Sequence, residues 1–311
     1  MNFKNIHQSA KVVVIGKKIF RILNGIYWLI KNIYKHPLTS NNKLITFYIA
    51  FKTFINLTIQ KKIIINWVNK KKLIIHSKKD FSTIFNHLFV LFDYIEMKFL
   101  SKILSKNMIF LDIGANSGVY SVLASSYCKK IYSFEPNIKV FKNLIKNLKL
   151  NKIKNICLNI GIGKDNSIAR ITKNLGDQNY IINKKKLNIP SYKIQLKNID
   201  SFKFKKKKLV IKIDVEGHEL DVLIGSKKTF YQNKLIIIII EMNDKKSNSK
   251  KIQKFLKSHK FVNIKFDLKN NKILSKNKIS RFNEIYTNNY SLLKKMFHNT
   301  NNNIIYKDKI I

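Results

Sequence analysis

The stretch from Phe110 to Gly118 constrains the fold of this chain more than any other part of the sequence. It reads F-L-D-I-G-A-N-S-G, continues an apolar run that begins at Met108, and precedes a helical pattern. An apolar strand, a tight glycine loop and a helix start are the elements with which an α/β domain opens a nucleotide site. Gly114 and Gly118 lack a Cβ atom, so the backbone can turn sharply there and approach a ligand closely.

The spacing of these glycines excludes two common phosphate-binding loops. The pattern is G-x-x-x-G with Asp112 two residues before the first glycine, which differs from the G-x-G-x-x-G of dinucleotide-binding domains. No Gly-Lys-Ser or Gly-Lys-Thr follows, so the loop is not a P-loop. The next apolar strand, Ile131 to Phe134, ends at Glu135, where an acidic side chain can accept hydrogen bonds from both ribose hydroxyls. The sequence therefore predicts a nucleoside site, with the alternative that Glu135 only caps the following helix.

A second polar cluster follows another buried strand. The run I-K-I-D-V-E-G-H-E, from Ile211 to Glu219, places Lys212, Asp214, Glu216 and His218 near a strand end. Ligands of open α/β sheets bind beyond the carboxyl ends of the strands, so we expect this cluster to face the same crevice as the glycine loop. Acidic residues also stabilise a helix N-terminus, which would explain one carboxylate but not this mixture of side chains.

These motifs together resemble the FkbM-type family of class I S-adenosylmethionine-dependent methyltransferases. Order and spacing agree over about residues 108 to 245, through D-I-G-A-N-S-G, F-E-P, L-I-K-N-L-K-L-N, I-K-I-D-V-E-G-H-E and the I-I-I-E that ends at Glu241. The resemblance implies an α/β Rossmann-like sheet with helices on both faces, S-adenosylmethionine as donor and O-methylation of a hydroxyl. Family substrates are diverse, so the acceptor, whether a small molecule or secondary metabolite, a sugar or a lipid-linked glycan, is not inherited.

The resemblance also suggests how the donor is held. The backbone of the loop from Gly114 through Asn116 to Gly118 would hold the methionine part of S-adenosylmethionine. Asp112 would order that loop or bind the ammonium group, and Glu135 would hold the ribose. Because methyl transfer is an in-line displacement, alignment of the acceptor oxygen with the methyl carbon and sulfur is expected to supply much of the catalysis.

A hydroxyl is a weak nucleophile near neutral pH, so a general base close to the methyl group helps. His218 is the candidate base by its ordinary pKa, with Asp214 or Glu216 as orienting partner or alternative base. The alternative is that His218 merely occupies a helix start. Asp214, Glu216 and Glu241 could bind a divalent cation such as magnesium, but three scattered carboxylates are a weak metal signature and no metal is predicted.

The charge of the chain, formally +44, would ordinarily favour nucleic acid or an anionic membrane as partner. All but three of the 61 basic residues are lysine, however, whereas base and phosphate recognition favours the planar arginine fork. The composition resembles that of an A/T-rich coding bias, so a nucleic-acid partner is not expected. An RNA methyltransferase is kept as the alternative function, and a non-catalytic, membrane-associated protein that retains the fold as a third.

The first 60 or so residues are expected to be helical, with a break at Pro37. Lys17, Lys18 and Arg21 interrupt the first apolar run, so it lacks the form of a signal peptide. The run from Leu44 to Ile59 contains Lys52 and falls short of a bilayer span. We expect both segments to pack on the core, with a membrane surface as the alternative. Cys128 and Cys157, which lack metal-binding spacing, indicate a reducing compartment. We therefore expect a cytoplasmic protein, with a peripheral position at the inner face of the membrane as the alternative.

Three regions are predicted. Residues 1–80 would form a helical extension with a β-hairpin, residues 81–270 the methyltransferase domain, and residues 271–311 a loosely ordered C-terminal extension. Within the domain, single helices are expected over residues 85–104 and 219–230, and the polar stretch 164–208 is expected to form a β excursion over the site. The sequence does not indicate an oligomeric state.

Overall fold

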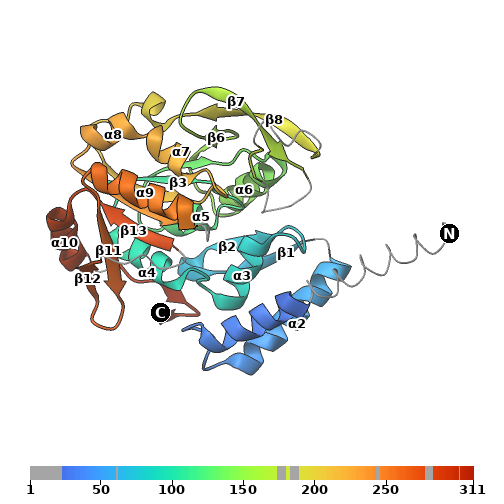
Figure 1. Ribbon diagram of the computed structural model, residues 1–311. Helices are drawn as coiled ribbons and strands as arrows, with labels where there is room; N and C mark the ends of the chain where they lie inside the picture. The colour runs from blue at the N-terminus through green and yellow to red at the C-terminus, as the bar shows by residue number, and fades with distance from the viewer. Residues whose placement is uncertain are drawn as a thin grey trace, which may run out of the picture.

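A central mixed sheet organises the chain (Figure 1). The computed structural model describes residues 23–60, 62–173, 180–182, 189–242, 246–276, 283–300 and 302–311. In spatial order, the eight strands are β12 (Lys272–Ser275), β11 (Val262–Asp267), β13 (Asn283–Thr287), β10 (Leu235–Glu241), β9 (Lys208–Ile213), β3 (Ile109–Ile113), β4 (Lys130–Phe134) and β5 (Ile156–Leu158).

The strand directions confirm the expected Rossmann-like fold. Strands β5, β4, β3, β9 and β10 are parallel, and their order along the sheet is third, second, first, fourth and fifth in the chain. That order reverses beside β3, as in a doubly wound α/β fold. Strand β13 pairs antiparallel with both β10 and β11, and β11 also pairs antiparallel with β12.

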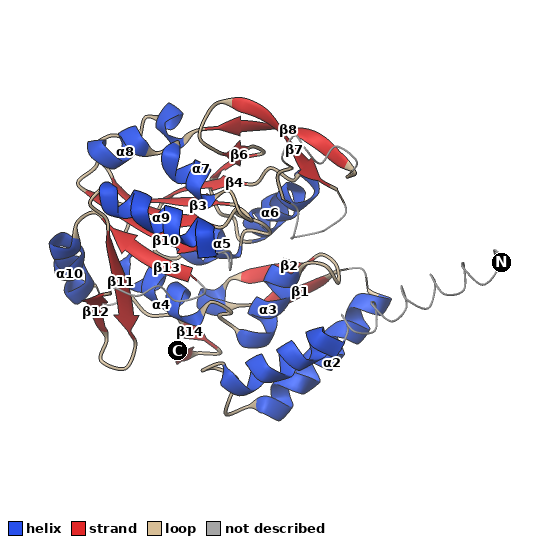
Figure 2. Ribbon diagram, in the orientation of Figure 1, coloured by secondary structure: helices blue, strands red, loops and turns tan. Residues whose placement is uncertain are grey.

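Helices cover both faces of the sheet (Figure 2). One face carries α4 (Tyr94–Ile103), α5 (Val119–Ala124), α6 (Ile138–Leu150) and α10 (Tyr290–Asn299), and the other carries α7 (Glu219–Ile224), α8 (Lys227–Gln232) and α9 (Lys246–Ser258). Alternate residues of the isoleucine run in β10 join the two layers, with Ile237 and Ile239 on one side and Ile236, Ile238 and Ile240 on the other. Burial on both faces explains why these strands read as continuous apolar runs.

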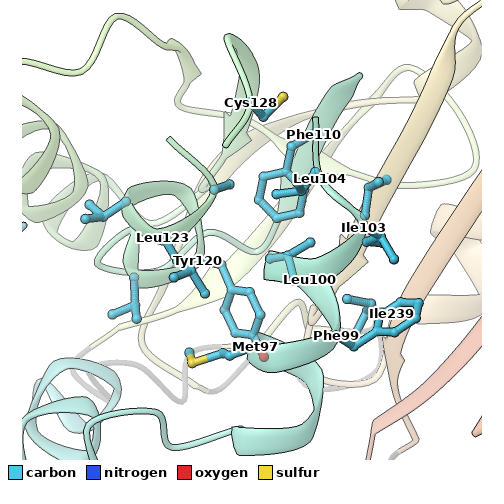
Figure 3. Close-up of a cluster of buried hydrophobic side chains, with 14 of the residues drawn as sticks. Met97, Phe99, Leu100, Ile103, Leu104, Phe110, Tyr120, Leu123, Cys128 and Ile239 are labelled. Atoms are coloured by element: carbon cyan, nitrogen blue, oxygen red, sulfur yellow. The ribbon is translucent and has the colours of Figure 1, made fainter. Parts of the chain in front are cut away.

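Helix α4 fills the core beneath the glycine loop. Figure 3 shows Leu100 and Ile103 of α4 beside Phe110 of β3 and Ile239 of β10, and all four side chains belong to the same buried cluster. Tyr120 of α5 lies in this cluster too, with its hydroxyl directed out of it. The packing of α4 therefore fixes β3 and α5, between which the glycine loop runs.

The prediction of a single helix over residues 85–104 is wrong. The chain forms α3 (Phe81–Phe89) and then α4, because Val90 adopts a left-handed backbone with φ 67°. The Trp67 indole donates to the Val90 carbonyl, and the Phe92 amide donates to the Asn86 side chain. These side chains pair the backbone polar groups at the break between the two helices. The apolar periodicity of the sequence does not reveal such bonds. The helix expected over 219–230 is likewise two helices, α7 and α8.

The C-terminal residues are part of the sheet, which corrects the expected boundary at 270 and the expected loose order of residues 271–311. Strand β13 lies between β10 and β11, and α10 buries Leu293 and Phe297 in the main core. The last strands, β14 (Ile305–Tyr306) and β15 (Lys309–Ile310), form a small hairpin. The asparagine- and lysine-rich composition of this segment obscured its apolar positions, which alternate with polar residues.

The remaining strands match the predicted positions. Strands β1 (Ile63–Asn66) and β2 (Lys72–Ile75) form the expected hairpin. The predicted β excursion is a three-stranded sheet of β6 (Gly161–Ile162), β8 (Ser191–Lys197) and β7 (Ser167–Thr172). Short 3-10 helices cover Val68–Lys70 and Ile199–Phe202.

The N-terminal helices only partly follow the expectation of core packing. Residues 23–35 form a helix that runs beside α2 (Lys43–Ile59), and the break between them contains Pro37 (Figure 1). Ile33 is buried against Phe47 and Ile49, but many other apolar side chains of both helices are exposed. Core packing therefore accounts for one side of this pair and not for the other. No helix in the described residues is long and apolar enough to cross a membrane.

Candidate functional site

A cavity of about 420 Å³ lies at the carboxyl ends of β3, β4, β9 and β10. This is the edge of a parallel sheet at which α/β folds bind ligands, and the volume is within the range of small-molecule sites. Its polar lining consists of Ser82, Asn86, Asp93, Asp112, Asn116, Tyr120, Glu135, Asn137, Lys212, Asp214, Glu216, Glu241 and Asn283. Both predicted motifs, the glycine loop and the cluster after β9, therefore face one cavity.

Gly114 holds these two motifs together. Its backbone has φ 79°, its N–H donates to the Phe134 carbonyl over 3.0 Å, and a Cβ atom there would lie 1.8 Å from the Asp214 carbonyl oxygen. Only glycine permits this approach between the loop and the end of β9. Gly118 has φ 85° at the start of α5, and a Cβ there would lie 2.4 Å from the Leu144 side chain. Gly118 is thus a packing position outside the cavity lining.

Glu135 lies at the end of β4 and closes one wall of the cavity. Its two carboxylate oxygens accept backbone hydrogen bonds from Asn116 over 3.0 Å and from Asn137 over 2.8 Å. These bonds hold the Glu135 carboxylate between the glycine loop and the start of α6, at the cavity wall. Asn116 itself has φ 50°, a left-handed backbone that asparagine tolerates better than most residues.

The glycine loop is anchored by residues that sequence reasoning missed. Asp80 caps α3 by accepting from the Thr83 amide, and it also accepts a 2.8 Å hydrogen bond from the Ser117 hydroxyl. The Asn147 side chain of α6 donates to the Ser117 carbonyl over 2.7 Å. Asp80 looks like an ordinary helix cap in the sequence, which is why its contact with a loop 37 residues later went unnoticed.

Asp112 is buried at the end of β3 and binds the helix that follows the loop. The Ser121 hydroxyl donates to its carboxylate over 2.5 Å. Burial raises the pKa of Asp112 to about 6, and the Ser121 bond opposes that shift. Asp112 thus links the end of β3 to α5, the two elements between which the loop runs.

A buried lysine stands at the centre of the acidic side of the cavity. Lys212 is 2% exposed, its Nζ lies 2.8 Å from the Asp214 carboxylate, and it lies 4.9 Å from the centre of the Tyr120 ring. Burial acts to raise the pKa of Asp214, but the positive charge of Lys212, together with hydrogen bonds from Glu241 and Lys212, outweighs it and holds the pKa below its usual value. Lys212 thereby keeps Asp214 ionised inside the fold.

Two further acids complete this cluster. Repulsion from Asp214, followed by burial, raises the pKa of Glu241 to about 9, so that its carboxyl is protonated at neutral pH. Asp93 accepts a 2.8 Å hydrogen bond from the Tyr120 hydroxyl, and burial raises the pKa of Asp93. Asp93 and Tyr120 were not predicted as site residues. Nothing in the local sequence distinguishes Asp93 from a helix cap, and Tyr120 resembles a core aromatic.

Glu216 lies at the cavity, whereas His218 does not line it. Partial burial, and then the neighbouring carboxylates of Asp214 and Glu219, raises the pKa of Glu216 to about 7. Its backbone has φ 52°, an unusual conformation for a non-glycine residue and one that is enriched at functional sites.

Both nitrogens of the His218 ring have partners within the protein. Its Nδ1 lies 3.1 Å from the Asp221 carboxylate and its Nε2 3.4 Å from the Ile181 carbonyl oxygen. The bond to Asp221 raises the pKa of His218, and the residue precedes α7 at its N-cap position. Of the three predicted catalytic residues, the cavity thus brings together Asp214 and Glu216. In the described part of the chain, no group of three or more His, Cys, Asp and Glu side chains is arranged to hold a metal ion.

Comparisons with known proteins agree with this architecture. Residues 112–262 match the sequence model of the methyltransferase FkbM domain, a range that begins at Asp112 and includes both loops of the cavity and Glu241. No curated protein matches the chain.

Several solved structures are similar to this chain at low sequence identity. The methyltransferase FkbM from Methylobacillus flagellatus KT is 14% identical with a TM-score of 0.39, and the match covers 68% of this chain and 55% of that one. An rRNA methylase from Streptococcus thermophilus is 12% identical with a TM-score of 0.37, over 63% of this chain and 93% of the other. TYW2 from M. jannaschii, in complex with AdoMet, is 14% identical with a TM-score of 0.37, over 73% and 84%.

Proposed function

The chain carries an FkbM-type methyltransferase domain, and on this basis we propose that it transfers the methyl group of S-adenosylmethionine to a hydroxyl of a glycan or secondary-metabolite acceptor. The observation that carries the proposal is the shared cavity, in which Glu135 and the glycine loop lie opposite Asp214 and Glu216. One side offers groups suited to a nucleoside, and the other offers carboxylates suited to an acceptor hydroxyl.

The cavity residues fit S-adenosylmethionine. Glu135 would accept hydrogen bonds from the ribose hydroxyls, and the backbone from Gly114 to Asn116 would contact the methionine part. The apolar part of the cavity lining includes Phe134 and Val140, which would pack against a purine ring. When bound, S-adenosylmethionine supplies an electrophilic methyl group on a positively charged sulfur. The protein contributes alignment, exclusion of water and a place for the acceptor proton.

Glu216 is the general base that this geometry favours, in place of His218. Glu216 lines the cavity, and its pKa of about 7 suits proton transfer near neutral pH. Asp214 would serve as the acceptor of a hydrogen bond from the substrate, because Lys212 keeps it ionised and its pKa is too low for efficient proton uptake. Glu241, protonated at neutral pH, would donate hydrogen bonds.

We expect Glu135→Gln to weaken binding of S-adenosylmethionine and S-adenosylhomocysteine by about 10- to 100-fold, since hydrogen bonds to a charged group contribute roughly 1.5–3 kcal/mol. Isothermal titration calorimetry of the purified protein measures this directly. Asp267→Asn, at an exposed carboxylate that does not line the cavity, is the matched control and should bind both molecules like the wild type. Unchanged affinity in Glu135→Gln would show that the ribose is held elsewhere.

The pH dependence of turnover separates the two candidate bases. Below about pH 7 the Glu216 carboxyl is protonated and cannot accept the acceptor's proton, so kcat/KM should rise as the pH increases through about 7. Glu216→Gln should lower kcat by roughly 100-fold or more and remove this rise. His218→Gln should keep both turnover and the profile, because its ring nitrogens face Asp221 and Ile181. The reverse pattern would assign the base to His218.

The acceptor class is tested by transfer of a labelled methyl group. We expect labelling of hydroxyl-bearing sugars, lipid-linked glycans or secondary metabolites, in a cytoplasmic reaction, and no dependence on a divalent metal. The probes are panels of these compounds together with total RNA, with and without a metal chelator. Labelling of RNA alone would overturn the acceptor proposal and leave the methyltransferase assignment intact.

A further inference from the structure

The pair formed by helix 23–35 and α2 has an inverted amphipathic pattern. In α2 the buried side chains are Thr46 and Thr53, whose hydroxyls donate to carbonyl oxygens of the preceding turn. The side chains of Leu44, Phe51 and Phe54 are 85%, 66% and 62% exposed. A surface helix that packs only on its own domain normally turns its apolar residues inward. The core of this chain therefore does not explain the apolar residues of α2.

Helix 23–35 extends the same surface. Tyr27 and Ile30 are exposed, whereas Ile33 is buried in a small cluster against which Phe47 of α2 packs. Both helices lie together along one side of the molecule (Figure 2). We call the exposed side chains of Tyr27, Ile30, Leu44, Tyr48, Phe51 and Phe54 the helical apolar face. Large apolar side chains exposed together on neighbouring helices are typical of an interaction site.

The charges around the helical apolar face are of one sign. No aspartate or glutamate precedes Asp80 in the sequence, and the two helices carry Lys31, Lys35, Lys43 and Lys52. Two of these lysines lie over aromatic rings of the pair, with Lys43 Nζ 4.5 Å from the centre of the Tyr34 ring and Lys52 Nζ 5.8 Å from that of Tyr48. Lysines beside tyrosine and phenylalanine are characteristic of helices that lie in a lipid headgroup layer.

From this combination we infer that the helical apolar face docks the protein onto an anionic lipid bilayer. The aromatic and aliphatic side chains would enter the boundary between headgroups and acyl chains, and the lysines would contact lipid phosphates. A nucleic acid would engage the lysines but leave the apolar side chains exposed, so a lipid surface matches both features. Helix α2 has 17 residues with Lys52 in its middle, which favours a position in the plane of the interface.

The docking surface is connected to the cavity by aromatic contacts. The ring centre of Trp28 lies 4.9 Å from that of Phe85 and 6.0 Å from that of Phe92, and both phenylalanines line the cavity. Docking would therefore bring the cavity wall close to the lipid surface. An acceptor with a lipid tail could then be reached without leaving the bilayer. The docking inference itself does not depend on methyl transfer or on the identity of the donor.

The test is cosedimentation of the full chain with lipid vesicles, without any donor or acceptor. One set contains phosphatidylcholine alone, and the other also contains about one third phosphatidylglycerol, a fraction that gives a negative surface potential. We expect binding to the anionic vesicles that weakens as salt increases. The triple variant Leu44→Ser, Phe51→Ser, Phe54→Ser keeps every charge and should lower the apparent affinity by at least about tenfold, because it removes the apolar side chains that enter the interface.

Two control variants and one lysine variant complete the design. Ile168→Ser and Tyr231→Ser replace apolar residues that are 73% and 76% exposed on β7 and α8, and should bind vesicles like the wild type. Replacing Lys31, Lys43 and Lys52 by glutamine should weaken binding by about fivefold per lysine and reduce its salt dependence. Circular dichroism and unfolding temperature establish that each variant is folded.

Three results would overturn the inference. The first is no binding of the wild-type protein to anionic vesicles. The second is equal binding of the wild type and the triple serine variant, since the overall lysine charge would then suffice. The third is a dimer of the wild type in light scattering that the triple serine variant abolishes, together with no vesicle binding. A second copy of the chain would then cover the helical apolar face.

Discussion

Gly114→Ala should lower the free energy of unfolding by about 2–5 kcal/mol and abolish measurable binding of S-adenosylmethionine. An L-residue at φ 79° costs roughly 1–2 kcal/mol, and overpacking a tight site adds about 1–3 kcal/mol. The new Cβ would lie 1.8 Å from the Asp214 carbonyl oxygen, so either the loop or the end of β9 must move. Both elements border the cavity, and a shift of either changes the donor site.

Gly217→Ala is the matched control for this prediction. Gly217 also has a positive φ, at 100°, but a Cβ there would meet no atom within 4 Å. It should therefore lose only the backbone cost of about 1–2 kcal/mol and keep donor affinity within a few fold. Denaturant unfolding and calorimetric titration measure the two quantities. Equal losses in Gly114→Ala and Gly217→Ala would show that the contact with Asp214 does not constrain the site.

Lys212→Met should destabilise the fold by about 3–5 kcal/mol, because it removes the cation from a buried cluster of carboxylates. Methionine retains most of the volume of the lysine stem, so the loss of charge dominates the effect. In the wild type, the lowered pKa of Asp214 contributes stability that is present above the ordinary aspartate pKa and is lost as the pH falls below it. The variant lacks this contribution. The difference in folding stability between the wild type and Lys212→Met should therefore shrink as the pH is lowered toward 4.

Lys208→Met tests the same substitution at the exposed start of the same strand. It should change the free energy of unfolding by less than about 0.5 kcal/mol. The double variant Lys212→Met, Asp214→Asn should recover part of the stability lost in Lys212→Met, because the unpaired carboxylate is neutralised. A deficit that is independent of pH and unaffected by Asp214→Asn would mean that Lys212 acts through packing rather than through its charge.

The parallel part of the fold and the location of the cavity were predictable from the sequence. The runs that end at Ile113, Phe134 and Ile213 are short, apolar and bounded by glycine or charged residues, and each is a strand of the parallel sheet. The carboxyl ends of neighbouring parallel strands lie at one edge, so the motifs that follow them had to meet there. The sequence likewise indicated that Gly114 and Gly118 take backbone conformations that favour glycine.

The acidic half of the site was only partly predictable. Asp214 and Glu216 follow β9 and line the cavity with Glu135, as their positions after the strands indicated. Asp93 and Tyr120 come from helices whose side-chain directions depend on how α4 and α5 pack. Whether His218 or Glu216 faces the cavity depends on one turn of backbone after Val215, where Glu216 takes φ 52°. Residue type and spacing do not encode that choice.

Local pattern and long-range packing thus determined different parts of this protein. The sequence by itself determined the parallel strands, the glycine loop and the position of Glu135, because each depends on residues close together in the chain. Tertiary structure decided that β13 lies inside the sheet, that Asp80 anchors the loop, and that α2 buries two threonines while exposing Phe51 and Phe54. Each of these outcomes depends on which distant element lies opposite, and that partner is set by the packing of the whole domain.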